Sequence, residues 1–375
     1  MSAFELVQNL SQRPVIKVIG VGGGGGNAVS HMVESGLSGI DFIATNTDVQ
    51  ALEKSSTSTV LQIGKLLTKG LGAGAKPDIG RQAAMEDRDR IRELLVGTDM
   101  LFIAAGMGGG TGTGAAPIIA EISRELGILT VAVVTRPFKF EGRNREQQAN
   151  AGLKALAEHV DSLITIPNDR LLTILGKEAS LSDSFRAANN VLLGAVRGIS
   201  DVIIRPGEIN LDFADVTTVM SIQGLAMMGA GEATGDDRAI EATNQAIASP
   251  LLDNINLAGA EGILVNVTTN GDLSMGEFSE VGELIQEFAS ETANVIIGMC
   301  HDDSLQQGEL KVTIVATGLG KFTDTSLPLN ARTSLRTAAS AVDGSLAAPI
   351  RQKSDQEKLF GDILDVPAFL RRQAD

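Results

Sequence analysis

Residues 104–114 read Ala-Ala-Gly-Met-Gly-Gly-Gly-Thr-Gly-Thr-Gly, and the rest of the chain is best understood by working outward from this stretch. An apolar run from Met100 to Ala104 precedes it, and residues 115–118 (Ala-Ala-Pro-Ile) follow it. This order predicts a strand, then a loop, then a helix with proline near its first turn. The loop and the first helical turn leave backbone N–H groups without intrahelical partners, so the stretch predicts an anion-binding site.

The glycine loop predicts a phosphate site that works without a lysine. Glycine lets the main chain wrap closely around phosphate oxygens, the helix dipole adds partial positive charge, and the hydroxyls of Thr111 and Thr113 can donate hydrogen bonds. A Walker A loop requires GxxxxGK[ST], and this loop contains no lysine. The candidate phosphate-binding residues of the loop are Gly108, Gly109, Gly110, Thr111 and Gly112.

Length, charge and cysteine content limit the class of protein. A chain of 375 residues can form two domains with substantial cores. Its 31 basic and 46 acidic residues give a net charge of −15, which argues against a general role on nucleic acid or on a lipid surface. The single cysteine, Cys300, allows no intramolecular disulfide and fits a reducing compartment. We see no signal-peptide pattern and no apolar run approaching 18 residues, so we expect a cytoplasmic protein without membrane insertion.

A second glycine-rich stretch follows the first predicted strand. Residues 20–27 read Gly-Val-Gly-Gly-Gly-Gly-Gly-Asn. Gly20, Gly22 and Gly25 satisfy GxGxxG, so an NAD(P)-dependent Rossmann enzyme is an alternative interpretation. A dinucleotide fold places an acidic residue at the tip of the second strand, and here Asp48 lies a few residues beyond that tip. The alternative is weakened but stays open.

Strand and helix patterns alternate as far as about residue 180. Residues 128–135 are a continuous apolar run, as in a parallel sheet covered on both faces. The alternation predicts an α/β, Rossmann-like parallel-sheet domain with ligand loops at the carboxyl ends of the strands. One further glycine loop, residues 68–77, could close over a terminal phosphate or could simply be a flexible surface connection.

Glu141 and Arg145 lie in one of the predicted ligand loops. A carboxylate there can accept both ribose hydroxyls, and an arginine can meet phosphate. The same two residues are four apart, which is also the spacing of an exposed ion pair on a helix.

Residues 180–205 predict a long central helix. Apolar side chains recur at steps of three and four over about 22 residues, which gives one apolar stripe. Phe185 and Asn189 lie four apart on one face near its start, so an aromatic ring and an amide can together hold a flat base. Taken alone, Phe185 is as readily a core residue, and the base-binding interpretation depends on the phosphate loops upstream.

Asp212 and Asp215 follow the long helix. Their spacing of three is typical of an N-cap residue and an acid in the first helical turn, which interact with the free N–H groups and the positive dipole end of a helix. The functional interpretation is a carboxylate pair that positions and polarises a water molecule. Because a helix of roughly 35 to 40 Å separates the pair from the base-binding end, the acids cannot easily act within their own subunit.

The remaining chain predicts a smaller α+β domain and a tail. Residues 213–229 and 236–248 are expected to be helices, and short strands are expected between 262 and 317. A polar stretch without periodicity then predicts a disordered linker. The last 14 residues regain a cluster of five large apolar side chains, which predicts a docking segment. The expected divisions are an N-terminal extension (1–14), a nucleotide-binding domain (15–179), a central helix (180–205), a C-terminal α+β domain (206–318), a linker (319–361) and a docking tail (362–375).

These motifs together resemble the tubulin/FtsZ superfamily of GTPases, and in particular its bacterial cell-division branch. The resemblance rests on the glycine loop after Gly22, on residues 108–114, on the pattern Asn210-x-Asp212-x-x-Asp215 and on the tail sequence of residues 362–372. It implies a GTPase that binds GTP or GDP with Mg²⁺, stacks head to tail into protofilaments of a division ring, and hydrolyses GTP at the subunit interface. It also implies a mid-cell position on the inner face of the membrane, with the tail docking to membrane-tethering and regulatory division proteins.

The resemblance also assigns roles to single residues. Asn210, Asp212 and Asp215 would enter the site of the next subunit and complete catalysis, while Glu141 and Arg145 would meet the ribose and phosphate region. Asn190 stands where the family often has aspartate, and an asparagine accepts with one oxygen where aspartate accepts with two, so guanine selectivity could be altered. The implied phosphate and guanine ligands outside the first loop are Gly23, Gly24, Gly25, Gly26, Asn27, Phe185, Asn189 and Asn190.

Three functional hypotheses follow from the sequence. The leading one is a self-assembling GTPase, the second an NAD(P)-dependent enzyme, and the third a nucleotide-dependent scaffold that does not hydrolyse its ligand. No cluster of metal ligands is visible, and the three histidines are isolated. Mg²⁺ is therefore expected only as the companion of a triphosphate.

Overall fold

The computed structural model describes residues 13–320, apart from 177, 206, 208, 210 and 253–258 and the side chains of residues 173 and 174. The expectations for the docking tail, for all of the linker except residues 319 and 320, for nearly all of the N-terminal extension, and for Asn210 lie outside the described residues.

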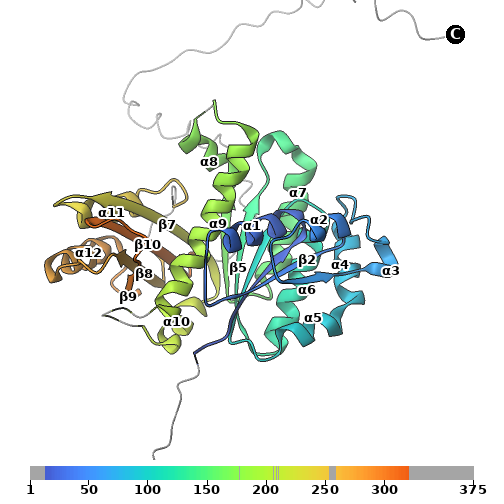
Figure 1. The fold of residues 1–375 in the computed structure, drawn as a ribbon, viewed down its shortest axis with the longest axis horizontal. Helices are drawn as coiled ribbons and strands as arrows, with labels where there is room; N and C mark the ends of the chain where they lie inside the picture. The colour runs from blue at the N-terminus through green and yellow to red at the C-terminus, as the bar shows by residue number, and fades with distance from the viewer. Residues whose placement is uncertain are drawn as a thin grey trace, which may run out of the picture. The chain divides into compact units, whose positions relative to one another are not determined.

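The described residues contain a ten-stranded sheet in the order β3-β2-β1-β4-β5-β6-β7-β10-β8-β9 (Figure 1). Strands β1 to β6 are all parallel, β7 and β8 pair antiparallel with β10, and β9 runs parallel to β8. The mixed α/β class with a mostly parallel sheet is confirmed. The strands are β1 (Ile16–Val21), β2 (Asp41–Asn46), β3 (Thr59–Gln62), β4 (Met100–Gly106), β5 (Leu129–Arg136), β6 (Ser162–Pro167), β7 (Gly224–Thr234), β8 (Gly262–Thr269), β9 (Asn294–His301) and β10 (Glu309–Thr317).

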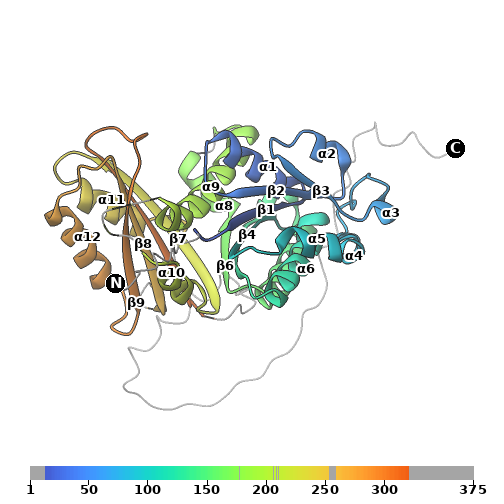
Figure 2. The ribbon, with the colours of Figure 1, turned by 60° about the horizontal axis from the view of Figure 1, so that its bottom comes forward.

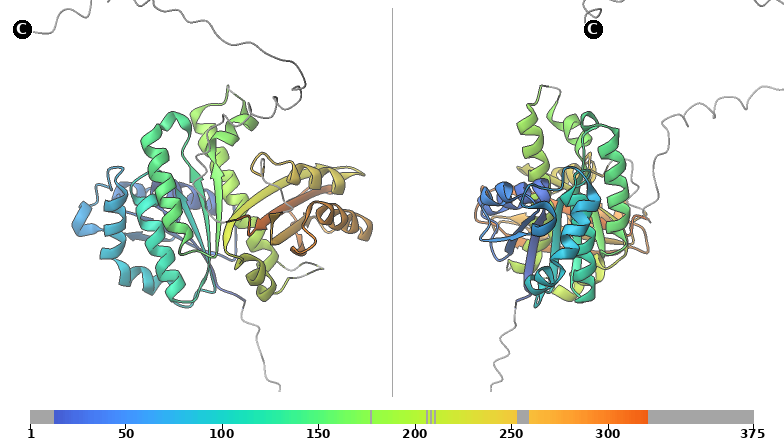
Figure 3. Two further views of the ribbon diagram at one scale, coloured as in Figure 1. Left: turned by 180° about the vertical axis from the view of Figure 1, so that it is seen from behind. Right: turned by 90° about the vertical axis from the view of Figure 1, so that its right-hand side faces the viewer.

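Helices cover both faces of the parallel strands (Figures 2 and 3). They are α1 (Gly22–Glu34), α2 (Val49–Glu53), α3 (Lys65–Thr68), α4 (Pro77–Glu86), α5 (Arg88–Leu95), α6 (Thr111–Glu125), α7 (Arg143–Ala157), α8 (Asn168–Leu175), α9 (Leu181–Ile204), α10 (Phe213–Met220), α11 (Arg238–Ile247) and α12 (Met275–Phe288), with a single 3-10 turn η1 (Lys139–Glu141). The two-sided cover explains why β4 is apolar at every position: Phe102 packs into the core beneath α1 and α9, and Ile103 packs into the core beneath α4 to α7.

The predicted long helix is present as α9. Ser180 caps it, with its hydroxyl accepting a hydrogen bond from the Asp183 N–H at 3.1 Å. Its apolar stripe, which includes Leu192 and Ile199, is buried against α1 and the sheet. Among the described helices α9 alone has the length and hydropathy of a possible membrane span, and half of that window is buried within the protein, as in a core helix.

One expected helix is wrong over its second half. Helix α10 ends at Met220, and residues 224–234 form β7 instead. Strand β7 pairs with β6 over its first three residues and with β10 over the rest, so it carries the sheet from the parallel strands to the others. Gly229 and Gly231 allow α11 to pack closely against β7, because a Cβ at either position would lie 2.0 Å from a carbonyl oxygen of α11. Tertiary pairing and close helix packing override the helical composition of the segment.

Candidate nucleotide-binding site

A cavity of about 660 Å³ lies where several strands of the parallel sheet end. Its lining includes Gly106 at the end of β4, Thr135 near the end of β5, and Asn168 directly after β6. The carboxyl edge of a parallel sheet is where α/β proteins bind ligands, and the volume is in the range of small-molecule sites. The cavity is therefore the candidate site.

The glycine-rich stretch after β1 contributes Gly23, Gly24 and Asn27 to the cavity lining. The helix α1 begins at Gly22 itself, earlier than the glycine run suggests, so most of this run forms the helix N-terminus. Gly25 instead lies where a Cβ would come 2.2 Å from the Ala104 carbonyl oxygen, so it brings α1 close to β4. Gly26 lines a separate, much smaller cavity. Three of the five candidates in this stretch thus face the main cavity.

The loop after β4 contributes Gly109, Gly110, Thr111 and Gly112. Gly109 and Gly110 precede α6, and Thr111 and Gly112 begin it; no described side chain caps its first turn. Backbone N–H groups are thus exposed to the cavity with the positive end of the helix dipole behind them. The remaining candidate of this loop, Gly108, has φ of 96° and packs against the backbone of α7.

The two loop threonines differ in what they do. Thr111 lines the cavity, and its hydroxyl lies 2.7 Å from that of Thr47. Thr113 is buried, and its hydroxyl accepts a hydrogen bond from the Gly108 N–H at 2.8 Å. Thr113 therefore shapes the glycine loop from within.

Glu141 and Arg145 line the cavity and also form the ion pair that their spacing suggested. Arg145 Nη1 lies 2.6 Å from Glu141 Oε2, while Glu141 Oε1 accepts a hydrogen bond from the Phe138 N–H at 2.9 Å. The two side chains can pair with each other and still face the cavity, because both lie in its wall.

The first half of α9 forms another wall. Phe185 and Asn189 line the cavity, and the ring of Phe185 is 43% exposed although it packs edge-on against Phe138 at a centroid separation of 5.5 Å. A ring so exposed in the cavity wall is available for a flat ligand. Asn190 does not line the cavity in the described structure; its Oδ1 lies 2.6 Å from Nε2 of His31 on α1.

Four polar residues of the lining were not predicted as ligands from the sequence: Asn46, Asp48, Thr135 and Asn168. Asn168 is 4% exposed, and its Oδ1 has no hydrogen-bond partner among the described residues. A buried amide oxygen facing a cavity without a partner indicates a ligand that donates to it. Thr135 lies near the end of the neighbouring strand β5. The prediction that ligand loops follow the strand ends would have identified Asn168 and Thr135, had each strand end been searched.

The glycine loop between α3 and α4 also reaches the cavity, as one of its two interpretations expected. Residues 71–75 are part of the lining. Gln148 on α7 donates a hydrogen bond from Nε2 to the Ala75 carbonyl oxygen at 3.3 Å. Asp48, which caps α2, is the lining carboxylate on this side.

Asp212 and Asp215 lie away from the cavity. Both are exposed at the start of α10, and neither belongs to the cavity lining. Figure 1 shows α10 beyond the end of α9 that is opposite to α8. The 24 residues of α9 span about 36 Å at about 1.5 Å per residue, so these acids do not reach the cavity of their own chain.

The donor set of the cavity fits a nucleotide triphosphate better than an isolated metal ion. Among the described residues no group of three or more His, Cys, Asp or Glu side chains is arranged to hold a metal. Backbone amides, one arginine and one exposed ring are the groups that phosphates and a base require.

Comparisons with known proteins match the part of the chain that contains the glycine loops and, separately, its C-terminal part. Residues 15–176 match the model of the Tubulin/FtsZ family, GTPase domain, and residues 224–320 match that of the FtsZ family, C-terminal domain. The cell division proteins FtsZ of Pseudomonas putida and Pseudomonas aeruginosa are each 57% identical to the chain, over 99% of its length and 100% of theirs. An FtsZ dimer from M. jannaschii has a similar fold, with a TM-score of 0.79 and 42% identity over 83% of this chain and 90% of that one.

Proposed function

Because the chain belongs to the tubulin/FtsZ family of GTPases, we propose that its catalytic centre is divided between two successive subunits of a filament. The chain is a self-assembling GTPase of bacterial cell division. The proposal concerns how its residues carry out that activity. One subunit supplies the cavity that holds GTP, and the next supplies the acids that complete hydrolysis.

The cavity residues divide by chemistry into three groups. The backbone amides of the two glycine loops hold phosphates, Glu141 and Arg145 meet the ribose and phosphate region, and Phe185 with Asn189 holds guanine. The buried Oδ1 of Asn168 accepts from a donor of the bound nucleotide, which would satisfy its lone pairs. A Mg²⁺ ion accompanying the triphosphate would neutralise part of its charge, and Asp48, whose Oδ1 caps α2, would hold the waters of the ion through its other oxygen.

Asp212 and Asp215, together with Asn210, act on the nucleotide of the neighbouring subunit. A carboxylate can orient a water molecule and accept its proton as that water attacks the terminal phosphate. The described cavity residues with carboxylates, Asp48 and Glu141, are engaged in a helix cap and an ion pair. The acids of the next subunit therefore supply the free carboxylate that the cavity lacks.

One observation carries this proposal: Asn189 faces the cavity, while Asp215 is exposed at the opposite end of α9. A contact that brings one end of a subunit to the other end of the next is heterologous and generates an open filament. Hydrolysis then depends on assembly, and it weakens the contact that produced it, so it acts as a timer for disassembly.

A dilution series tests the proposal directly. GTP turnover per molecule should stay near zero below a threshold protein concentration and rise above it, with the threshold matching the onset of assembly seen by light scattering. Binding of GTP, followed with a fluorescent analogue, should show no threshold because the cavity belongs to one subunit. A turnover per molecule that is constant across the series would overturn the divided site.

We also infer that the parts outside the described residues connect the filament to the division site. Residues 362–375 would dock to membrane-tethering and regulatory division proteins, because a free polar tail has no other reason to keep five large apolar side chains. The linker (319–361) would set the distance of the filament from its anchor on the cytoplasmic face of the membrane at mid-cell. We also propose the domain limits 15–179, 180–205 and 206–318, as the sequence predicts them.

An NAD(P)-dependent enzyme is not favoured. The GxGxxG pattern is present, but the matching family is a GTPase family over the same residues. Gly25 of the pattern serves close packing between α1 and β4.

A further inference from the structure

A buried ion cluster lies at the end of α9 and takes no part in the cavity. Arg205 Nε lies 3.2 Å from Asp201 Oδ1, and Arg205 Nη1 lies 3.2 Å from Asp302 Oδ1. Asp201 is 3% exposed and Asp302 is 9% exposed. Two carboxylates taken out of water at this depth require strong compensation, which the guanidinium of Arg205 provides by contacting both.

The cluster connects three separate segments. Asp201 belongs to the last turn of α9, Arg205 is the first residue after that helix, and Asp302 directly follows β9. Asp302 is itself held firmly: its N–H donates to the Thr269 carbonyl oxygen at 2.9 Å, and its Oδ1 accepts from the Ser304 N–H at 3.0 Å and from the Ser304 hydroxyl at 2.7 Å. Arg205 is thus anchored to the edge of the sheet at a fixed point.

The described residues that follow Arg205 lie along β9. The Met299 N–H donates to the Ile209 carbonyl oxygen at 3.2 Å. A Cβ at Gly207 would lie 1.8 Å from the Met299 carbonyl oxygen, and a Cβ at Gly298 would lie 3.0 Å from Leu211. These contacts hold Gly207, Ile209 and Leu211 against β9, and Asp212 is the residue that comes next.

We propose that Arg205, held between Asp201 and Asp302, is a positioning residue for hydrolysis: it fixes the loop that carries Asp212 and Asp215 and so sets where these acids enter the next subunit's site. This inference rests on the proposed divided site. Arg205 touches neither the nucleotide nor the reacting atoms, and its effect passes through the loop. An error of about 1 Å in the placement of catalytic groups can cost about a hundredfold in rate.

The cluster also makes the positioning sensitive to pH. Burial raises the pKa of Asp201 to about 6, against the lowering effect of the Arg205 and Arg197 guanidinium groups, and Asp302 adds a further upward contribution. Of the other titratable groups described beside the cluster, Cys300 is neutral in this range because burial raises its pKa to about 12, and the side chain of His301 pairs with the exposed Asp303. Below about pH 6, Asp201 therefore loses its charge and with it the ion pair to Arg205.

The test compares Arg205→Ala, Arg205→Lys and Asp302→Asn with a control, Asp303→Asn, whose side chain is exposed beside the cluster. Turnover is measured per assembled subunit at saturating GTP, and GTP binding is measured separately. We expect turnover of Arg205→Ala to fall by about tenfold to a hundredfold with GTP binding unchanged, because the cavity lies at the other end of α9. Lysine keeps the charge without the two-pronged contact and should restore turnover only in part, whereas the control should match the wild type.

A pH series distinguishes the positioning role of the cluster from a purely structural role. The ratio of wild-type to Asp201→Asn turnover should fall toward one as the pH is lowered from about 7.5 to about 5.5, because protonation removes in the wild type the charge that the variant already lacks. A constant ratio, or wild-type turnover in Arg205→Ala, would overturn the positioning role. Asp215→Ala is measured alongside: if it retains turnover the divided site fails, and if it is inactive while Arg205→Ala is fully active only the positioning role fails.

Discussion

His31 on α1 and Asn190 on α9 are joined side chain to side chain, with Nε2 of the histidine 2.6 Å from Oδ1 of the asparagine. The contact ties together two helices that both border the nucleotide cavity. The contact occupies a lone pair of the one side-chain oxygen of Asn190, so we expect Asn190 to act by aligning α9 and Asn189 to contact the base.

Asn189→Ala should lower the preference for GTP over ATP by about fivefold to tenfold, which is the effect of losing one hydrogen bond of about 1 to 1.5 kcal/mol. Asn190→Ala should change that preference by only about threefold or less. Competition binding between GTP and ATP measures the preference of both variants. His31→Gln, which alters the hydrogen-bond partner of Asn190, is the matched control for the Asn190 variant. A larger effect at Asn190 than at Asn189 would mean that Asn190 contacts the base directly.

Asp215→Ala should bind GTP and form filaments while losing at least about a hundredfold in turnover, because general acid–base assistance is typically worth that much or more. Nucleotide binding, sedimentation of filaments and phosphate release report the three properties. Asp236→Asn, an exposed acid in the turn before α11, is the control and should behave as the wild type. Normal phosphate release by Asp215→Ala would remove the acid from the mechanism.

Gly25→Ala and Gly109→Ala should separate folding from binding. A methyl group at Gly25 meets the Ala104 carbonyl oxygen at 2.2 Å, so this change should lower the free energy of unfolding by about 1 to 3 kcal/mol. A methyl group at Gly109 meets nothing within 4 Å in the protein and enters the cavity, so it should weaken GTP binding with stability nearly unchanged. Urea unfolding and nucleotide titration measure the two effects, and equal effects of both changes on stability would contradict the distinction.

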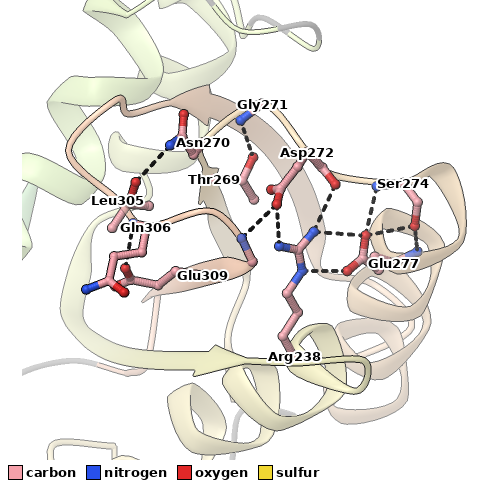
Figure 4. A network of polar contacts seen from close by, with 11 residues as sticks. Arg238, Thr269, Asn270, Gly271, Asp272, Ser274, Glu277, Leu305, Gln306 and Glu309 are labelled. Atoms are coloured by element: carbon pink, nitrogen blue, oxygen red, sulfur yellow. Dashed lines mark hydrogen bonds and ion pairs between the residues drawn. The ribbon is translucent and has the colours of Figure 1, made fainter.

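Arg238, Asp272 and Glu277 form a network that holds α11 and α12 to the loop between β8 and α12 (Figure 4). Hydrogen bonds from Arg238 lower the pKa of Glu277 from its ordinary value of 4.5 to about 2. The folded state thus keeps the carboxylate charged where the unfolded chain takes up a proton. The stability that Glu277 contributes is present above about pH 4.5 and is lost as the pH falls toward about 2.

Glu277→Gln should therefore lower the free energy of unfolding at neutral pH, by about 3 kcal/mol if the network behaves as a buried pair with one partner removed. It should also reduce the loss of stability between about pH 4.5 and about pH 2, because the variant has no proton to take up there. Denaturant unfolding at low protein concentration, with Glu280→Gln on the exposed face of α12 as control, measures both. A pH dependence as steep as that of the wild type would exclude Glu277 as its source.

Deletion of residues 362–375 should leave GTP turnover and its concentration threshold unchanged, because neither glycine loop nor the acids are touched. Recovery of the protein at division sites in cells, followed with a fluorescent fusion, should be lost. Loss of turnover in the truncated protein would show that the tail is not a separate docking segment.

The parts of the site that the sequence identified are those that short stretches specify on their own. A strand followed by glycines and a helix N-terminus fixes its backbone by local sterics and local hydrogen bonds, so the loops at Gly23 and Gly110 could be recognised without knowing what packs around them. Helix periodicity likewise located α9, and its length alone placed Asp215 far from Asn189.

Tertiary structure decided what depends on strand order and register. Residues 224–234 become β7 because β6 and β10 offer edges to pair with, which no local pattern reveals. Asn168 reaches the cavity because β6 lies beside β5, and Asp302 meets Arg205 because β9 ends beside the last turn of α9, about a hundred residues away in sequence. Local sequence sets the backbone of each segment, but contacts between distant segments are fixed only when the whole sheet assembles and its two faces are buried.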